Sequence, residues 1–256
     1  MERKPRIALL IDADNVQADK IELILNELSG LGETSIRRAY GNWTKPGLKG
    51  WAAVLHENAI RPMQQYDYSR GKNASDMAMV VDAMALLYTD RPDAFGIVSS
   101  DADFTPLVMH LRERGATVYG FGEAKTPEPF KSACSRFLVL DRLQTEDDQG
   151  ETEQNASTSK ASSAGRSRVP TAQLKQDAKL VALLRRAVQG AEDESGWARV
   201  STVGNHIANQ SSFDSRNYGY ARLIKLLEAT DLFDIRDEGK PTLAVRDKRQ
   251  AKSGRA

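Results

Sequence analysis

The sequence is poor in the residues that form disulfides and bind transition metals. It contains one cysteine, Cys134, and three histidines among 256 residues. A single cysteine excludes an internal disulfide and a zinc site built from several thiolates, and it is typical of a protein in a reducing compartment. The histidines, His56, His110 and His206, lie far apart without the spacing of metal ligands. We expect Cys134 to be a small buried hydrophobic residue.

The sequence also lacks long apolar runs and a large net charge. No stretch approaches the roughly 20 apolar residues that a membrane-spanning helix requires. The first residues lead directly into a short apolar segment without the features of a signal peptide. We therefore expect a cytoplasmic protein with no membrane partner. The formal net charge of +1 neither favours nor excludes a polyanionic partner. Evidence for such a partner has to come from the local distribution of charge.

Composition divides the chain into two folded parts. From Glu146 to about Arg168 there is no large apolar residue, and a segment that buries nothing cannot offset its ordering entropy. We interpret residues 146–170 as a flexible linker between a first domain, residues 1–145, and a second domain, residues 171–247. The last residues, 248–256, are interpreted as a frayed basic tail.

In the first domain, short β-rich runs alternate with helical patterns. This alternation indicates an α/β domain with a mainly parallel sheet that helices cover on both faces. The expected strands lie near Ile7–Ile11, Thr34–Tyr40, Ile60–Gln65, Phe95–Ser99, Ala116–Phe121 and Phe137–Leu140, and the expected helices near Ala18–Leu28, Lys49–Glu57, Asp76–Tyr88, Pro106–Arg114 and Glu128–Ala133.

The third expected helix has apolar residues at helical spacing. Met77, Val80, Val81, Met84 and Leu87 follow the i, i+3, i+4, i+7 pattern. We predict that this stripe packs in the core.

The second domain has the pattern of three helices closed by a β-hairpin. One helical face runs from Leu174 to Val188, a second helix opens at Ser201, and a third carries the apolar residues of 220–227. Segments 233–236 and 242–246 then flank a turn-forming stretch. This outline predicts a small winged-helix α+β domain.

Carboxylates gather where two expected strands end. The first strand ends in Ile11-Asp-Ala-Asp-Asn15, the fourth in Ser99-Ser-Asp-Ala-Asp-Phe104, and Lys72-Asn-Ala-Ser-Asp76 opens the third helix. Because ligands bind beyond the carboxyl ends of parallel strands, we expect these groups to face one crevice. Crowded carboxylates repel one another, and a bound cation keeps them ionised together. Oxygen ligands favour Mg²⁺ or Mn²⁺.

Such a cation can activate water and stabilise a leaving alkoxide, which predicts phosphodiester hydrolysis. Asp14 is expected to point away from Asp12, because neighbours in an extended chain alternate sides, and Asp82 is expected to be exposed or to support the site. The predicted site comprises the metal ligands Asp12 and Asp101, Asp76 and Asp103 as direct or water-bridged ligands, and Asn15 and Ser100 as groups that orient them.

From about Pro5 to Asp141 the chain resembles the NYN family of PIN-like nucleases. The resemblance is carried by Ile11-Asp12 with Asn15, the Tyr40-Gly-Asn-Trp43 loop, Lys72–Asp76 and Ser100–Phe104. It implies a Rossmann-like three-layer α/β/α fold and a metal site at Asp12, Asp76, Asp101 and Asp103. The activity that it implies is that of a metal-dependent endoribonuclease.

From about Thr171 to Asp247 the chain resembles the OST-HTH/LOTUS domain, through Gly196-Trp197, Val203-Gly-Asn205 and Phe213–Tyr220. The resemblance implies RNA binding or docking of a protein partner, and it favours RNA as the substrate. Trp43 either stacks a base or caps a core, and Tyr218 either stacks or packs. The candidate RNA contacts are Arg38, Trp43, Arg70, Lys72, Arg216, Tyr218, Arg222 and Lys225.

Two other functions remain open at this point. A non-catalytic RNA-binding adaptor would use the metal pocket only to grip phosphates, and its LOTUS module would recruit a partner. A haloacid-dehalogenase-like phosphatase would use Asp12 and Asp14 as its D-x-D pair, but it gives Asp76 no role. A phosphatase would release phosphate from small esters and leave RNA intact.

Overall fold

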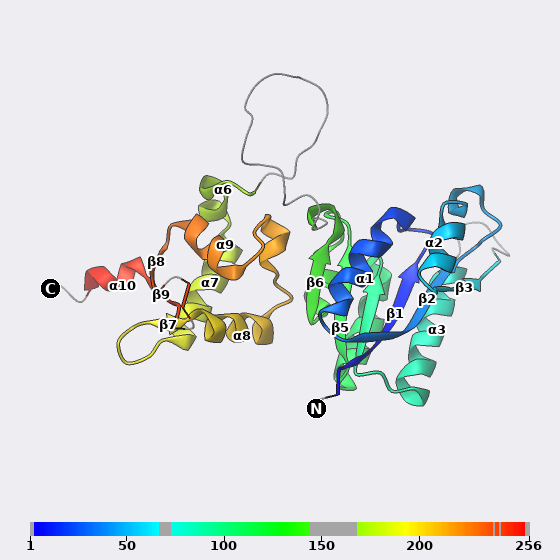
Figure 1. The fold of residues 1–256 in the computed structure, drawn as a ribbon, viewed down its shortest axis with the longest axis horizontal. Coiled ribbons are helices and arrows are strands. Elements are labelled where there is room, and N and C mark those ends of the chain that lie inside the picture. Colours follow the sequence, from blue (N-terminus) through cyan, green and yellow to red (C-terminus); the bar gives the residue numbers. More distant parts are fainter. Residues whose placement is uncertain (1–2, 67–72, 144–167, 238, 241, 254–256) are drawn as a thin grey trace, which may run out of the picture. The chain divides into compact units, whose positions relative to one another are not determined.

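The computed structural model describes residues 3–66, 73–143, 168–237, 239–240 and 242–253. The chain divides into two compact units, residues 1–150 and residues 151–256 (Figure 1). Arg70, Lys72 and most of the predicted linker lie outside the described residues. Within the described part, every helix is too short or too polar to cross a bilayer.

The first unit is built on six parallel strands in the order β3-β2-β1-β4-β5-β6. The order reverses beside β1, so that β1 lies between β2 and β4. This is the Rossmann-like arrangement expected from the sequence. The strands are β1 Arg6–Asp12, β2 Glu33–Gly41, β3 Arg61–Gln64, β4 Ala94–Val98, β5 Thr117–Gly122 and β6 Arg136–Val139.

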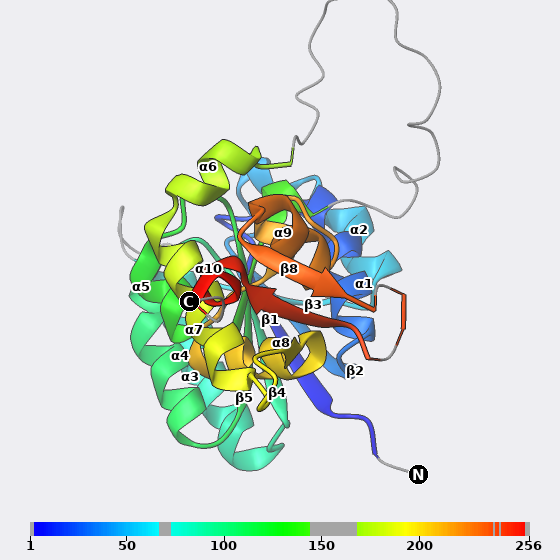
Figure 2. The same ribbon diagram turned by 90° about the vertical axis from the view of Figure 1, so that its left-hand side faces the viewer.

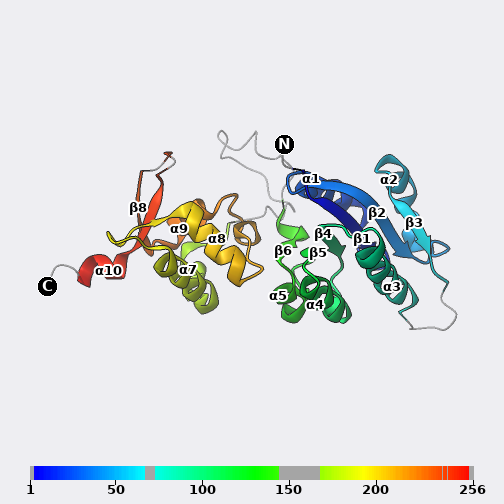
Figure 3. The same cartoon turned by 90° about the horizontal axis from the view of Figure 1, so that it is seen from below.

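Helices cover both faces of this sheet, as Figure 3 shows. Side chains alternate along β1: Ile7, Leu9 and Ile11 pack with α1 and α2, whereas Ala8 and Leu10 pack with α3, α4 and α5. The three-layer fold predicted from the sequence is therefore confirmed. The helices are α1 Ile21–Ser29, α2 Trp51–Glu57, α3 Ala74–Thr89, α4 Thr105–Glu113 and α5 Glu128–Ala133.

Single-turn helices lie in the described loops of this unit. They are η1 Ala18–Lys20, η2 Pro46–Leu48, η3 Ala102–Phe104 and η4 Leu140–Arg142. Cys134 is buried, as expected, and burial raises the pKa of its thiol to about 12.

The core face of α3 differs from the predicted one. Met77 and Val81 are 62% and 63% exposed, while Met79, Ala83 and Leu86 are buried against the sheet. The predicted apolar stripe is therefore wrong at Met77 and Val81, whereas Val80 and Met84 are partly buried against the core and Leu87 is buried. Because α3 is apolar on most of its surface, its spacing fits more than one stripe, and the polar contacts of Asp82 select the face that turns inward.

Asp82 accepts hydrogen bonds from Arg38 and from the hydroxyl of Tyr40, both on β2. The Asp82 and Arg38 side chains are only 18% and 21% exposed. Burial and the bond to Asp82 raise the pKa of Tyr40. Asp82 thus fastens α3 to β2, and Arg38, a predicted RNA contact, is engaged inside the domain.

The second unit has two long helices and a small antiparallel sheet in the order β7-β9-β8 (Figure 2). Its core gathers Leu184 of α7, Ile207 of α8, Leu227 of α9 and Val245 of β9. The elements are α6 Thr171–Gln176, α7 Ala178–Ala191, β7 Ala198–Arg199, α8 Val200–Gln210, η6 Ser215–Tyr218, α9 Leu223–Thr230, β8 Phe233–Arg236, β9 Ala244–Asp247 and α10 Lys248–Ser253.

This unit has the predicted winged-helix outline, with three local differences. The first expected helix is divided at Asp177, whose carboxylate accepts the Leu180 N–H and caps α7. The third helix starts at Leu223, because Tyr220 is held outside it by a bond from its hydroxyl to the Val169 carbonyl. A short helix, α10, occupies the start of the segment interpreted as a basic tail.

The Asp82 contacts predict an uneven response to substitution along α3. Asp82→Ala leaves Arg38 and the buried Tyr40 hydroxyl without their acceptor, so we expect it to lower the free energy of unfolding by about 2 kcal/mol. Val81→Gln changes an exposed position and should stay within about 0.5 kcal/mol. Urea unfolding of both variants measures the difference. Equal losses would contradict the role of Asp82 as a fastener.

Candidate functional site

The predicted carboxylates lie at the carboxyl ends of β1 and β4, the two strands beside which the strand order reverses. Asp12 is the last residue of β1. After β4, Asp101 immediately precedes η3, and Asp103 lies within it. Asp76 lies in the first turn of α3. Segments far apart in the sequence therefore meet at the sheet edge where open α/β folds bind ligands.

Asp12 is the most buried of these carboxylates, at 1% exposure. Its Oδ2 accepts hydrogen bonds from Asn15 Nδ2 at 2.8 Å and from Ser99 Oγ at 2.9 Å. Its Oδ1 is buried with no hydrogen-bond partner among the described residues. Burial raises the pKa of Asp12, the bonds from Asn15 and Ser99 oppose the rise, and the charge of Asp14 adds to it.

Ser99, rather than the predicted Ser100, is the serine that supports Asp12. Ser99 is fully buried, and its Oγ also accepts the Asp101 backbone N–H at 3.1 Å. It therefore ties the end of β1 to the loop after β4. Ser100 Oγ instead accepts the Glu123 backbone N–H at 2.9 Å. The sequence position of Ser99 could have indicated this role, because Ser99 directly follows β4, which lies beside β1.

Asp14 belongs to the cluster, contrary to the expectation that it points away. Its Oδ2 accepts a hydrogen bond from Ser75 Oγ at 3.0 Å, and its Oδ1 pairs with Lys45 Nζ at 3.2 Å. Asp12 and Asp14 are two residues apart, and alternation along an extended chain places such residues on the same side, so the expectation applied the pattern wrongly. Sequence reasoning missed Ser75 and Asp14 because their contact depends on where α3 starts in space.

The carboxylates act on one another most clearly at Asp76. Burial and then the charges of Asp12, Asp101, Asp14 and Asp103 raise the pKa of Asp76 to about 6. Four neighbouring carboxylates thus disfavour the charge on Asp76. This convergence was the central prediction for the geometry of the site.

Asp101 and Asp103 are organised by their own loop. Asp101 caps η3, because its Oδ1 accepts the Asp103 backbone N–H at 2.9 Å. Asp103 is exposed, and its Oδ2 accepts a bond from Asn73 Nδ2 at 3.4 Å. The cap leaves Asp101 with a second carboxylate oxygen at the sheet edge.

The donor set fits a divalent cation. The candidate ligands are the carboxylate oxygens of Asp12, Asp76, Asp101 and Asp103, of the kind that Mg²⁺ and Mn²⁺ prefer, and the partnerless Oδ1 of Asp12 offers a buried ligand. In the part of the chain that is described, no three acidic, histidine or cysteine groups are close enough to hold an ion as they stand. Rotation of these side chains would be needed to bring three of them to one ion.

Among the described residues of the first unit, Trp43, Asn15 and Arg38 have partners within the domain. Trp43 packs against the core on the α1 and α2 side, with its ring 6.4 Å from that of Trp51 at an edge-on angle. This favours the core interpretation of Trp43. Asn15 is in place beside Asp12, and Arg38 is bound to Asp82 as described above.

In the second unit, the predicted RNA contacts divide into inward and outward groups. Arg216 pairs with the buried Asp214 at 3.1 Å, and Tyr218 stacks on Phe213 with ring centres 5.9 Å apart. Lys225 pairs with Glu228 on the surface of α9. Arg222 is exposed.

Sequence reasoning missed an arginine pair on the sheet of the second unit. The guanidinium groups of Arg236 and Arg246 lie 4.5 and 4.6 Å from the ring of Trp197. Arg246 also pairs with Asp234 at 3.2 Å. Cation–π contacts of this kind hold guanidinium groups in place. The signal in the sequence was the tryptophan followed by arginines on both hairpin strands.

The raised pKa of Asp76 predicts how the stability of the metal-free protein depends on pH. Its folded pKa of about 6 exceeds its usual 3.8, so the penalty is absent below about pH 4, grows as pH rises and is complete above about pH 6. Asp76→Asn removes this penalty. We expect the variant to exceed the wild type by about 1 kcal/mol at pH 7.5 after allowance for solvent screening.

Thermal unfolding in EDTA at pH 4.5 and 7.5 measures this difference. The wild type should gain less stability than the variant, or lose more, between the two pH values. A variant that is less stable than the wild type at pH 7.5 would contradict the repulsion among the carboxylates.

Comparisons with known proteins identify the families of both domains. The model of the NYN domain matches residues 6–141, and the model of the OST-HTH/LOTUS domain matches residues 174–245. An uncharacterized protein of Methanocaldococcus jannaschii is 32% identical over 124 residues, which cover 46% of this chain and 47% of that protein. The chain therefore spans about half the length of this curated relative.

Two solved structures are also similar. A protein of unknown function from Vibrio parahaemolyticus aligns at 20% identity with a TM-score of 0.47, over 55% of this chain and 96% of its own. An uncharacterized protein of Nitrosomonas europaea aligns at 28% identity with a TM-score of 0.25, over 38% of this chain and 92% of its own.

The NYN match extends over 136 of the 256 residues, and it includes both strands that carry the carboxylates. The chain belongs to the NYN family, a branch of the PIN-like nucleases, and carries a second, C-terminal domain of the OST-HTH/LOTUS type.

Proposed function

We propose that this protein is a metal-dependent ribonuclease that cuts RNA internally by hydrolysis of phosphodiester bonds. The observation that carries the proposal is the Asp12 carboxylate, which is buried with one oxygen unpartnered at the point where other carboxylates converge. A buried anion of this kind is costly unless a cation or a hydrogen-bond donor satisfies it. The membership of the NYN family supports the reaction class.

Asp12, Asp76, Asp101 and Asp103 are the proposed ligands of Mg²⁺ or Mn²⁺. When bound, such a cation would polarise a phosphoryl oxygen and lower the pKa of a bound water. Asn15 and Ser99 hold Oδ2 of Asp12, so that Oδ1 is the oxygen left for the ligand. We propose that Ser99 takes the supporting role that the sequence assigned to Ser100.

The positive charges that would offset this acidic edge are few among the described residues nearby. Lys45 pairs with Asp14 in a partly exposed position, where an ion pair contributes little stability. We propose that a phosphate of the RNA can compete for Lys45. Arg38 and Trp43 are not proposed as RNA contacts, because their side chains are held by Asp82 and by the core.

The second domain is proposed to bind RNA and to present it to the first domain, across the linker predicted at residues 146–170. Arg222 is exposed, and Arg236 lies on the exposed end of β8, held near Trp197. Guanidinium groups in fixed positions suit phosphate recognition. A domain that docks a protein instead would give the adaptor function.

The decisive test is cleavage of a labelled structured RNA by purified protein in Mn²⁺, Mg²⁺ or EDTA. We expect cleavage only with a metal, and we expect Asp101→Asn and Asp12→Asn to lower its rate at least hundredfold, because each removes a charged ligand. RNA affinity should survive. Glu113→Gln, an exposed carboxyl at the end of α4, is the matched control and should cut normally.

Two other outcomes would point elsewhere. Binding without cleavage by the wild type, across several RNAs, would favour the adaptor. Release of phosphate from a small aryl phosphate ester, with RNA left intact, would favour the phosphatase.

The second domain makes a separate prediction. Arg222→Gln combined with Arg236→Gln should weaken RNA binding. It should also reduce the slope of log affinity against log salt concentration by the amount that about two phosphate contacts contribute. Fluorescence anisotropy over a salt series measures both quantities. An unchanged salt slope would remove these two arginines from the RNA-binding surface.

A further inference from the structure

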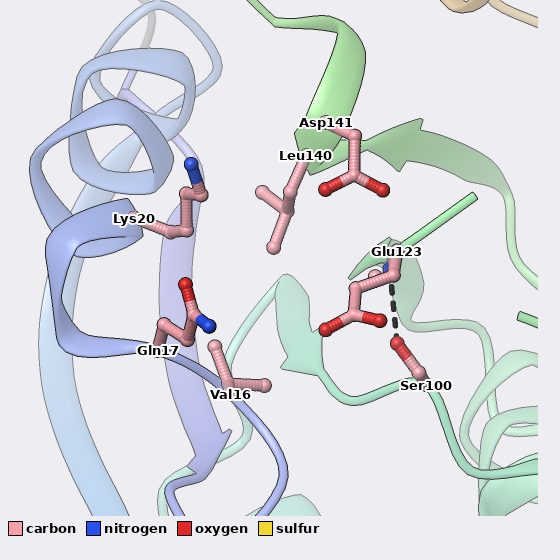
Figure 4. A pocket seen from close by; sticks show the side chains of 8 residues that line it. Val16, Gln17, Lys20, Ser100, Glu123, Leu140 and Asp141 are labelled. Carbon is pink, nitrogen blue, oxygen red and sulfur yellow. Dashed lines mark hydrogen bonds between the residues drawn. The ribbon is translucent and has the colours of Figure 1, made fainter. Parts of the chain in front are cut away.

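A cavity of about 270 Å³ opens beside the carboxylates, on the side of the sheet edge that α1 covers (Figure 4). A wider hollow of about 760 Å³ adjoins it, shares Val16, Gln17 and Glu123 with it, and reaches Asp14 and Asn15. The two spaces thus connect the proposed cleavage site with the cavity. We name the smaller space the base pocket. Its walls include Val16, Gln17, Lys20, Glu123, Leu140 and Asp141.

The loop that carries the proposed site also builds the base pocket. Ser100 lines the pocket and lies between Ser99, which holds Asp12, and Asp101. Its Oγ accepts the Glu123 backbone N–H, drawn as the dashed line in Figure 4, and so positions the Glu123 wall. A nucleotide next to the phosphate at the carboxylates can therefore reach this pocket with its base.

The two sides of the pocket differ in hydrogen-bonding character. Lys20 and Gln17 lie on one side, across the gap from Glu123 and Asp141, as Figure 4 shows. Lys20 can only donate hydrogen bonds, and ionised Glu123 and Asp141 can only accept them. Val16 and Leu140 add apolar surface from the two sides.

The carboxylates of this wall have capacity for a ligand. Asp141 uses Oδ2 to accept the Ala124 backbone N–H at 2.9 Å, which orients its side chain. Glu123 pairs with Lys125 at 2.8 Å, but Lys125 is 77% exposed and the Glu123 side chain 35%. An exposed ion pair of this kind is weak and can be exchanged for a ligand contact.

The two carboxylates make a phosphate an unfavourable ligand of this pocket, and the mixed lining suits a heterocycle. Two carboxylates on one wall repel a phosphate group, whereas apolar surface beside polar groups suits a flat base. Of the four RNA bases, guanine presents two N–H donors, N1 and N2, for a carboxylate, and acceptors, O6 and N7, for a lysine. Adenine lacks the O6 acceptor and the N1 donor.

We propose that the base pocket receives a guanine base next to the cleaved phosphate, with Glu123 or Asp141 accepting from N1 and N2 and Lys20 donating to O6 or N7. This specificity rests on the proposed ribonuclease function. It makes guanine-containing single-stranded RNA the substrate class.

Binding of free nucleosides tests the pocket without any cleavage. The full chain is titrated in EDTA with guanosine, inosine or adenosine, and binding is followed by changes in the NMR spectrum of the protein. We expect guanosine to bind roughly tenfold or more tightly than inosine, which lacks the N2 amino group, and adenosine to bind weakest. Glu123→Gln and Lys20→Met should each lose this preference, whereas Glu113→Gln should keep it. Equal binding of the three nucleosides would overturn the proposal.

Cleavage mapping separates the two proposals from each other. On an RNA that contains every dinucleotide step, the wild type should cut next to guanine, and Glu123→Gln should cut with less preference. Metal-dependent cleavage without any base preference would overturn the base pocket and leave the ribonuclease in place. Selective guanosine binding by a protein that cuts none of the RNAs would leave the pocket and overturn the ribonuclease.

Discussion

Repulsion among the carboxylates at the ends of β1, β4 and the start of α3 is the constraint on which the first domain depends. Asp12 lies at its centre, buried, with one oxygen held by Asn15 and Ser99 and the other without a partner. The rest of the fold has to hold this unfavourable arrangement in place. Such an arrangement is costly for stability alone, which is why its presence argues for a ligand that relieves it.

The sheet supplies the rigidity that the carboxylates need. The strands are buried on both faces, with Ile11 on one side of β1 and Leu10 on the other. This packing and the hydrogen bonds to β2 and β4 fix the position of the end of β1. Ser99 then couples β1 to the loop after β4. Asp82 fastens α3 to β2, and α3 in turn brings Asp76 and Ser75 to the sheet edge. Distant apolar packing thereby sets the distances between like charges.

The same sheet edge has a second side, where α1 and not α3 provides the wall. The alternation of side chains along β1 separates the two sides of this edge. Leu10 packs on the α3 side, and alternation places Asp12 on that side too, whereas Ala13 packs on the α1 side. One edge can therefore hold carboxylates for a cation and, next to them, a pocket of mixed donors and acceptors. The shared loop at Ser99, Ser100 and Asp101 joins the two.

Most of the fold could be predicted from the sequence, because periodicity and strand-end carboxylates are local patterns. The alternation of strands and helices and the winged-helix outline follow from residues within a few positions of one another. The expectation that Asp12, Asp76, Asp101 and Asp103 face one edge follows from the parallel sheet that this alternation implies. The family resemblance rested on those same local motifs.

Only the tertiary structure decided which partner each side chain has. Arg38 and Asp82 are 44 residues apart, Asp14 and Ser75 are 61 apart, and Asp12 and Ser99 are 87 apart. No periodicity distinguishes Ser99 from Ser100, or one apolar stripe of α3 from another. Those choices depend on how separate elements pack, and packing is decided by the free energy of the whole domain rather than by neighbours along the chain.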